Sequence, residues 1–330
     1  MSRAVRIGVV GATGALGAEV MTVLDGSRLR VAGILPIATQ RSVGEHVAFQ
    51  GEVFPVEMDA SLRGLDLVLC CAPAPASLEW VRLALKAEVP CIDCSGALAL
   101  SPEVPLCLGG EADAAVAGAP LLASPSGSAL ALARVLAPLQ RAAGLVRLGA
   151  TLLESSAAGG REGIAALGAE SIALFNQQDA PDASAAGRRL AFDCHPALGE
   201  VGEGGSTAVE ALLVRSLARL LGADLPVAAT VALIPTFIGM AASLSIELKA
   251  PLDARAAREV LAAAPGLELW THDAEGPNLR AAASRSEVLV GRLRDDPTRE
   301  RGLLLWLAAD PLRIAAANAV ALAELRLGPG

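Results

Sequence analysis

Residues 5–17 read VRIGVVGATGALG, and this stretch decides the fold of the chain. Its first six residues form an apolar run without helical periodicity, and residues 19–24 follow with a helical pattern. The glycines between them complete a strand, a tight turn and a helix, the context in which this motif indicates a dinucleotide site. Gly11 and Gly14 would let the backbone approach a pyrophosphate, and Gly17 would let the helix pack closely. The alternative is a tight turn that binds no ligand.

The segment after the second expected strand, residues 30–35, bears on the choice of cofactor. NAD-specific folds often place an acidic residue there, which accepts a hydrogen bond from the ribose 2′-hydroxyl. Residues 38–44 read ATQRSVG and contain no acid. Arg41 and Ser42 can instead hold a 2′-phosphate, so the sequence predicts NADP rather than NAD. The alternative is that Arg41 is a solvated loop residue.

Further apolar runs are expected to extend the same sheet. They span residues 66–71, 89–93 and 121–123, and helical segments separate at least the first two. A doubly wound parallel sheet requires this alternation of strand and helix. The front of the chain is therefore predicted to be a nucleotide-binding α/β unit of the Rossmann type.

Composition excludes several classes of partner. The 330 residues carry a net charge of −8 and contain only 2% aromatic residues, with no tyrosine. Nucleic-acid binding needs clustered cations or a stacking platform, so it is disfavoured. Residues 225–246 form an uncharged run long enough to span a bilayer, but prolines and a glycine interrupt it. We expect buried strands there, no membrane association and a cytoplasmic location.

The six cysteines do not indicate a disulfide framework, because they fit reduced, buried thiols in a chain of this length. Cys91 and Cys94 have the spacing of a redox motif or of half a zinc site. No second pair and no histidine lies near them in the sequence. We therefore predict a strand end at this segment and no metal site.

Motifs along nearly the whole chain resemble those of the aspartate-semialdehyde dehydrogenase family. They occur in order at residues 10–14 (VGATG), 41–44 (RSVG), 92–97 (IDCSGA), 138–144 (PLQRAAG), 191–193 (AFD), 290–294 (VGRLR), 310–313 (DPLR) and 318–320 (NAV). The resemblance implies a cysteine thiolate that attacks the acyl group of a β-aspartyl phosphate and a nicotinamide that exchanges hydride. It also implies a histidine that manages the proton, and two arginines and a glutamine that hold the substrate.

Each of those catalytic roles falls on an unsuitable residue here. Gly127 stands in place of the cysteine, and Met240 in place of the histidine. Leu233 and Ala99 stand in place of the arginines, and Leu153 in place of the glutamine. A glycine offers no nucleophile and a methionine cannot shuttle protons. The pattern resembles the cysteine-less, Usg-type subgroup and predicts a pseudoenzyme without catalytic residues.

A few other residues could supply a displaced nucleophile. Ser126 and Ser128 flank the gap without an identifiable base, and Ser128 is expected to be the N-cap of the following helix. Cys94 is expected on a loop that approaches the cofactor, where its thiol could react. Cys194 and His195 are expected at a strand end, where adjacent side chains point apart.

The resemblance implies a fold of two parts. A Rossmann domain comprises residues 1–126 plus 310–330, including a helix over 310–327, and an α+β domain with a mixed sheet comprises residues 127–309 and pairs subunits into homodimers. Apolar or alternating runs mark the strands of the second part at residues 146–153, 227–237, 242–248, 288–293 and 303–308. Residues 160–178 and 180–187 have the turn and flexible composition of an insertion near the interface.

The resemblance also implies NADP as the cofactor, with contacts from several loops. They are Gly11, Ala12, Thr13, Gly14, Leu16, Arg41, Ser42, Ala72, Ser95, Gly96 and Asn318. The loop 124–128 precedes a helix, whose N-terminus suits an anion. We expect a pocket there for a small anion or an apolar acyl group, walled by Leu153, Leu233 and Met240, or else a filled and silent core.

Three other functions stay open at this point. The first is a residual oxidoreductase that passes hydride directly to a free carbonyl. The second is an active semialdehyde dehydrogenase with a displaced nucleophile. The third is a structural homodimer that no longer binds nucleotide.

Overall fold

The computed structural model of the chain describes residues 3–42, 44–110, 116, 118–179, 189–222, 224–271 and 275–328. The chain divides into two compact units, Met1–Gly127 with Leu312–Gly330, and Ser128–Pro311. Two parts of the sequence prediction, Val43 and the segment 180–187, lie outside the described residues. No described helix is long and apolar enough to cross a membrane.

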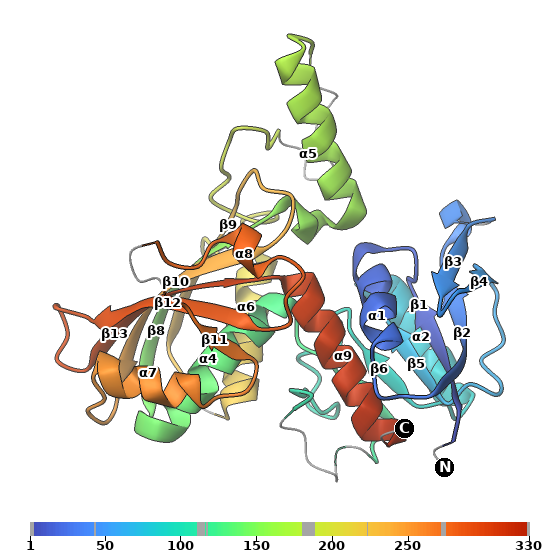
Figure 1. The fold of residues 1–330 in the computed structure, drawn as a ribbon, viewed down its shortest axis with the longest axis horizontal. Coiled ribbons are helices and arrows are strands. Elements are labelled where there is room, and N and C mark those ends of the chain that lie inside the picture. The colour runs from blue at the N-terminus through green and yellow to red at the C-terminus, as the bar shows by residue number, and fades with distance from the viewer. Residues whose placement is uncertain are drawn as a thin grey trace. The chain divides into compact units, whose positions relative to one another are not determined.

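The first unit is built on a parallel sheet in the order β2-β1-β5-β6-β7 (Figure 1). Its strands are β1 (Val5–Val10), β2 (Val31–Ile37), β5 (Leu67–Cys70), β6 (Cys91–Asp93) and β7 (Leu121–Ala123). Helices α1 (Ala15–Asp25) and α9 (Pro311–Leu327) share a buried core with one face of this sheet. Helix α2 (Ala74–Lys86) packs on the other face. This is the doubly wound arrangement that the sequence predicts.

A short two-stranded hairpin, β3 (His46–Phe49) with β4 (Glu52–Pro55), was not predicted. It follows the turn η1 (Gln40–Ser42), which closes the segment after β2. Phe49 is buried in the core that α1 and α9 cover. The hairpin therefore extends the nucleotide-type unit beyond its parallel sheet.

The second unit is built on a mixed sheet in the order β11-β12-β13-β10-β8-β9 (Figure 1). Its strands are β8 (Leu145–Glu154), β9 (Val227–Leu233), β10 (Met240–Leu248), β11 (Leu267–Leu269), β12 (Val288–Asp295) and β13 (Gly302–Ala309). The outer pairs β8–β9 and β11–β12 are parallel, and the pairs between them are antiparallel. The predicted fold class, a Rossmann-type sheet with a second α+β domain that has a mixed sheet, is confirmed.

Alternation along β8 gives this sheet one buried face. Leu148, Ala150, Leu152 and Glu154 are buried, whereas the residues between them are more exposed. The helices of this unit are α4 (Gly127–Ala143), α5 (Gly160–Phe175), α6 (Ala208–Leu221), α7 (Ala254–Ala262) and α8 (Leu279–Ala282), with the turn η2 (Ser156–Gly159). A capping box of Thr207 and Glu210 begins α6, with each side chain bonded to the other's backbone N–H.

Two sequence predictions about this unit were wrong. Residues 160–178, expected to be flexible, largely form the helix α5. Gly163 serves close packing, because a Cβ there would lie 2.3 Å from the carbonyl oxygen of Ser156. The strand expected over 227–237 ends at Leu233, and residues 234–239 form a loop that leads into β10.

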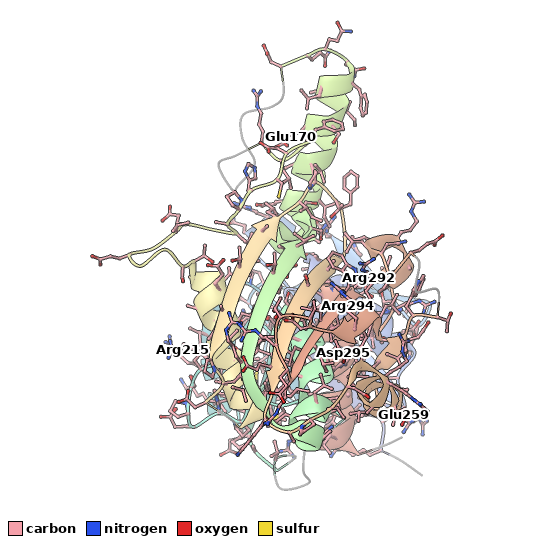
Figure 2. The ribbon with its side chains drawn as sticks, turned by 90° about the vertical axis from the view of Figure 1, so that its left-hand side faces the viewer. Glu170, Arg215, Glu259, Arg292, Arg294 and Asp295 are labelled. Atoms are coloured by element: carbon pink, nitrogen blue, oxygen red, sulfur yellow. The ribbon has the colours of Figure 1, made fainter. Side chains whose placement is uncertain are left out.

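Helix α5 is tied to a segment that lies well beyond it in the sequence. Glu170, midway along α5 (Figure 2), is buried, and its Oε2 accepts hydrogen bonds from the N–H groups of Leu190 and Ala191, at 2.8 and 2.9 Å. The rings of Phe175 and Phe192 also meet edge to face, with centroids 5.6 Å apart. The carboxylate therefore anchors the segment that begins near Leu190.

Candidate functional site

The glycine loop after β1 has the conformation that a close backbone approach requires. Gly11 has φ +79°, and a Cβ there would lie 2.7 Å from the backbone nitrogen of Ala72. A Cβ at Gly17 would lie 2.1 Å from the carbonyl oxygen of Gly11. The expectation that Gly17 permits close packing of α1 is confirmed, because a larger residue would push the helix off the loop. Helix α1 follows directly, with Gly14 as its N-cap.

A second loop meets the glycine loop. Thr13 Oγ1 and Ser42 Oγ lie 2.9 Å apart, which joins the turn after β1 to the turn after β2. Arg41 precedes Ser42 in η1 and is exposed, whereas Ser42 is buried. The structure thus brings three of the predicted contact residues together at the carboxyl edge of the sheet, where ligands of such sheets bind.

Asp93 organises the loop after β6. Its Oδ1 accepts hydrogen bonds from the Ser95 hydroxyl at 2.6 Å and the Ser95 N–H at 3.0 Å, and its Oδ2 accepts one from the Leu98 N–H at 2.9 Å. Gly96, between these anchors, has φ +80°. The buried carboxylate therefore fixes the conformation of Ser95 and Gly96, two predicted contact residues.

Asn318 on α9, another predicted contact, is 2% exposed, and its side chain forms hydrogen bonds with the neighbouring loops. Its Nδ2 donates to the carbonyl oxygen of Cys107 at 3.1 Å and to Ser124 Oγ at 2.8 Å, while its Oδ1 accepts from the N–H of Gly109 at 2.8 Å. The amide thus holds the ends of two loops beside β7. Ala12 lies on the loop after β1, Leu16 in the first turn of α1, and Ala72 on the loop after β5.

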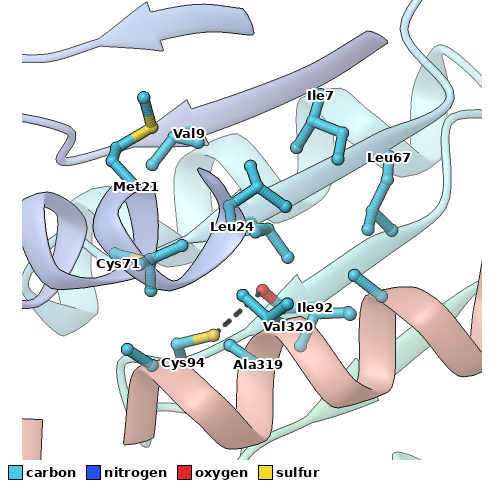
Figure 3. Packing of buried hydrophobic residues seen from close by; sticks show 14 of the residues in the cluster. Ile7, Val9, Met21, Leu24, Leu67, Cys71, Ile92, Cys94, Ala319 and Val320 are labelled. Carbon is cyan, nitrogen blue, oxygen red and sulfur yellow. Dashed lines mark hydrogen bonds between the residues drawn. The ribbon is translucent and has the colours of Figure 1, made fainter. Parts of the chain in front are cut away.

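Five of the six thiols lie in the core of the first unit. Cys94 is buried, and its Sγ lies 3.9 Å from the carbonyl oxygen of Ile92 (Figure 3). A hydrogen bond with Cys71, followed by burial, raises the pKa of the Cys94 thiol well above its ordinary value. Cys70 and Cys91 form another buried pair, with sulfurs 3.5 Å apart. These thiols are buried, which opposes a reactive Cys94. No metal-type cluster of three such ligands occurs among the described residues.

Three strand ends of the second unit meet in one row. Glu154, the last residue of β8, pairs with Leu233 on β9 and with Met240 on β10. Residues paired across neighbouring strands share one face of a sheet. All three are buried, with Glu154 6% exposed and Met240 fully enclosed. Two of the positions that the resemblance assigns to catalysis therefore flank an acidic residue that was not predicted.

Leu153 does not share the face of this row. It precedes Glu154 in β8, and successive side chains of a strand point to opposite faces. It pairs with Ala241 and Ala232 rather than with Met240 and Leu233. The expectation that Leu153, Leu233 and Met240 wall one pocket was therefore wrong in its grouping. The other two predicted positions belong to the first unit, where Ala99 is buried and Gly127 stands at the start of α4.

The Ser128 hydroxyl, from the first turn of α4, donates a hydrogen bond to Glu154 Oε1. Helix α4 starts at Gly127, so Ser128 lies inside the helix and the expectation that it is the N-cap was wrong. Burial raises the pKa of the Glu154 carboxyl, and the bond from Ser128 opposes this rise. A signal for Glu154 exists in the sequence, because it is a charged residue at the end of an otherwise apolar run.

Cys194 and His195 do not form a catalytic pair. His195 makes an isolated antiparallel bridge with Leu233, through two backbone hydrogen bonds of 2.9 Å. Its Nε2 lies 2.5 Å from the carbonyl oxygen of Arg189. Cys194 is exposed, and its N–H bonds to the side chain of Asp193. The expected strand end is a single bridge at the edge of the sheet.

Comparisons with family models cover most of the chain. Residues 6–117 match the model described as semialdehyde dehydrogenase, NAD binding domain. Residues 136–314 match the model described as semialdehyde dehydrogenase, dimerisation domain. The two matches fall on the parallel sheet and on the mixed sheet respectively.

Relatives align over the full length. A USG-1 protein homolog of Azotobacter vinelandii is 31% identical over 339 residues, covering 100% of both chains. The aspartate-semialdehyde dehydrogenase of Aquifex aeolicus is 30% identical over 335 residues, covering 98% of both. Among solved structures, aspartate semialdehyde dehydrogenase II of Vibrio cholerae complexed with ASA has a TM-score of 0.93 at 28% identity, covering 98% of each chain.

Proposed function

The chain belongs to the aspartate-semialdehyde dehydrogenase family, and from this premise we propose that it is an NADP-binding, dimeric pseudoenzyme. It keeps the residues that bind the nucleotide in this family and has lost the residues that carry out the covalent step. Its function is to contact another protein or to sense a ligand. The observation that carries this proposal is the row in which apolar Leu233 and Met240 flank Glu154.

Loss of the covalent step follows from the replaced positions. Gly127 offers no nucleophile, and neither Leu233 nor Met240 can hold a charged substrate or move a proton. Removing a nucleophile from a cooperating set typically costs about a million-fold in rate, or about 8 kcal/mol of barrier at roughly 1.4 kcal/mol per decade. The hydroxyl of Ser128 is engaged by Glu154, and a hydrogen bond with Cys71 together with burial raises the pKa of the Cys94 thiol, so neither replaces the cysteine.

The residues of the first unit fit a dinucleotide. Gly11 lets the loop after β1 pass close to the backbone of Ala72, Gly17 lets α1 pack closely against that loop, and the N-terminus of α1 follows the loop directly. Arg41 would hold the 2′-phosphate of NADP, with Ser42 and Thr13 beside it. Ser95 and Gly96, fixed by Asp93, would contact the rest of the cofactor. When bound, the nicotinamide would supply hydride chemistry.

We assign nucleotide binding to residues 1–126 with 310–330, and pairing of subunits to residues 127–309. The match of residues 136–314 to a dimerisation-domain model supports the second assignment. A homodimer would enclose faces of the mixed sheet that one copy leaves open. Size-exclusion chromatography with light scattering tests this directly.

An enzyme-excess single-turnover experiment tests the loss of activity. The protein, free of host dehydrogenase, is mixed with NADP, phosphate and aspartate semialdehyde, and NADPH formation is followed by absorbance. We expect no NADPH, while a parallel titration records binding of NADP. One slow turnover per site would overturn the pseudoenzyme proposal and favour a residual oxidoreductase. An absence of NADP binding would leave only a structural dimer.

A further inference from the structure

A pocket of about 780 Å³ lies in the second unit, where the mixed sheet meets α6. Its volume is within the range of sites that bind small molecules. Residues of β8, β9 and β10 line it together with residues of α6. None of the described lining residues belongs to the glycine loop or to the positions that the family uses for catalysis. The proposed function therefore does not account for this pocket.

Three hydroxyl groups cross the pocket in one row. Thr151 on β8 pairs in register with Thr230 on β9 and with Ser243 on β10. Residues paired in this way share one face of a sheet, and neighbouring strands lie about 4.8 Å apart, so the row spans about 10 Å. All three residues are exposed, and their hydroxyls have no hydrogen-bond partner in the described part of the chain. The row therefore offers both donors and acceptors to a ligand.

Small residues form the next row on the same face. Gly149 on β8 pairs with Ala228 on β9 and with Ser245 on β10, whose hydroxyl bonds to Asp296. No aromatic side chain is among the described residues that line the pocket, so a nucleotide base would have no ring to stack on. The two rows together suit a hydroxylated ligand rather than an aromatic one.

Two arginines supply positive charge beside these rows. Arg215 on α6 (Figure 2) is exposed and lines the pocket. Arg147 precedes Gly149 on β8, and its Nη1 lies 4.0 Å from the position that a Cβ on Gly149 would take. Neither guanidinium forms a hydrogen bond or an ion pair within the described residues. Both therefore keep their donors for a ligand.

The acidic groups nearby are already engaged. Glu210 is the acidic residue in the described lining, and its two oxygens accept hydrogen bonds from backbone N–H groups at 2.8 and 2.9 Å. Glu247, which pairs with Arg147 in register, instead forms an ion pair of 2.7 Å with Arg299. An anion in the pocket would therefore find two arginines whose charge no neighbouring carboxylate takes up.

We propose that this pocket binds a small phosphorylated polyol, such as a sugar phosphate. Arg147 and Arg215 hold the phosphate, because guanidinium groups match phosphate oxygens in both charge and geometry. The hydroxyls of Thr151, Thr230 and Ser243 exchange hydrogen bonds with the hydroxyls of the ligand. The site belongs to the second unit, so the proposal goes beyond nucleotide binding and does not depend on it.

Isothermal titration calorimetry with D-glucose 6-phosphate tests this proposal, with D-glucose and inorganic phosphate as its two separate parts. We expect glucose 6-phosphate to bind the full chain at least about tenfold more tightly than either part, since each part loses hydrogen bonds that the whole ligand makes. No binding of glucose 6-phosphate, or equally tight binding of glucose, would overturn the proposal. Equally tight binding of inorganic phosphate would refute the polyol as the ligand class.

Variants then locate the ligand. Arg215→Ala should weaken the binding of glucose 6-phosphate about ten- to hundredfold, since it removes a charged hydrogen-bond donor. Thr151→Val keeps the shape and should weaken binding about tenfold, whereas Thr151→Ser should bind as the wild type does. Arg280→Ala, which alters another exposed arginine of the same unit, is the matched control. Unchanged binding by Arg215→Ala and Thr151→Val would place the ligand elsewhere and refute the assignment.

Competition with NADPH separates this proposal from the proposed function. Saturating NADPH should leave the affinity for glucose 6-phosphate unchanged. Competition between the two would place the sugar phosphate in the nucleotide site and overturn the second site. Binding of glucose 6-phosphate by a protein that does not bind NADPH would overturn the nucleotide part of the proposed function alone.

Light scattering during the titration records the oligomeric state. We expect glucose 6-phosphate to bind without dissociating the proposed homodimer. Binding that requires dissociation would show that the second copy occupies the pocket, and this result would also overturn the proposal.

Discussion

Thr13 Oγ1 and Ser42 Oγ lie 2.9 Å apart, and this hydrogen bond joins two loops that follow neighbouring parallel strands. Loops at the carboxyl edge of a sheet are independent in sequence, so a direct bond between them fixes their separation. Arg41 is held next to that bond by the short turn η1. In the function proposed above, this pair of hydroxyls and Arg41 would contact the 2′-phosphate of NADP.

Arg41→Ala should therefore discriminate between the two nicotinamide cofactors. We expect NADPH binding to weaken about ten- to hundredfold, since a charged hydrogen bond contributes about 1.5–3 kcal/mol. NADH, which lacks the 2′-phosphate, should bind as before. Fluorescence titration measures both affinities, with the exposed Arg63→Ala as the matched control. An equal loss for both cofactors would assign Arg41 a structural role.

Gly17→Ala should disrupt the nucleotide loop. The added Cβ would lie 2.1 Å from the carbonyl oxygen of Gly11, which is backbone and cannot rotate away. We expect destabilisation of about 1–3 kcal/mol, as for overpacked cores, together with loss of NADPH binding. Gly33→Ala is the control, because a Cβ on that strand residue meets nothing within 4 Å. Urea unfolding of both variants gives the comparison.

Glu154→Gln should change how stability depends on pH. Burial raises the pKa of the folded-state carboxyl above that of the unfolded chain. The contribution of Glu154 is thus fully present below the unfolded pKa, about 4.3, and is lost as pH rises through the folded value. The variant does not titrate, so its unfolding free energy relative to wild type should rise across this window. A difference that is flat with pH would refute a buried acid here.

Glu170→Ala should release the segment near Leu190 from α5. Its carboxylate accepts hydrogen bonds from the N–H groups of Leu190 and Ala191, so both amides would lose their partner. Local opening should become easier by about 2 kcal/mol, seen as faster hydrogen exchange of these amides. Glu259→Ala, which removes an exposed helical ion pair (Figure 2), should leave exchange there unchanged.

Gly127→Cys alone should not restore turnover. NADPH should not form from aspartate semialdehyde even with the new thiol in place, because Met240 cannot accept a proton. Addition of Met240→His and Leu233→Arg tests whether the remaining roles limit the rate. Turnover by the single variant would mean that another group already performs the proton transfer.

Much of the fold could be predicted from residue periodicity. The strand Val5–Val10 and the strand Leu121–Ala123 have the predicted bounds, and the other predicted strands differ from the observed ones at their ends. Helix α5 could not be predicted, since its glycines lower helix propensity. A side chain at residue 163 would clash with η2, so a glycine is needed there. This is a tertiary contact, which the local sequence does not reveal.

The candidate site was predicted less completely. The glycine loop is a local motif, so its conformation at Gly11 could be anticipated. The partnership of Glu154 with Leu233 and Met240 depends on the register of three strands that are far apart in sequence. A shift of one residue would turn Glu154 to the other face, as happens to Leu153 beside it. Sequence periodicity gives the faces of one strand and leaves this register open.

The bonds of Asn318 have a consequence for the order of events on the ribosome. Asn318 holds Cys107, Gly109 and Ser124, which are translated some two hundred residues earlier. Chains fold as domains emerge, N-terminal first. Here α9 covers one face of the core of the parallel sheet. That face stays uncovered until the whole mixed sheet has been translated and α9 emerges. The half of the protein that is synthesised first is the last to be completed, and a nascent chain stalled before residue 312 would present that open core to chaperones.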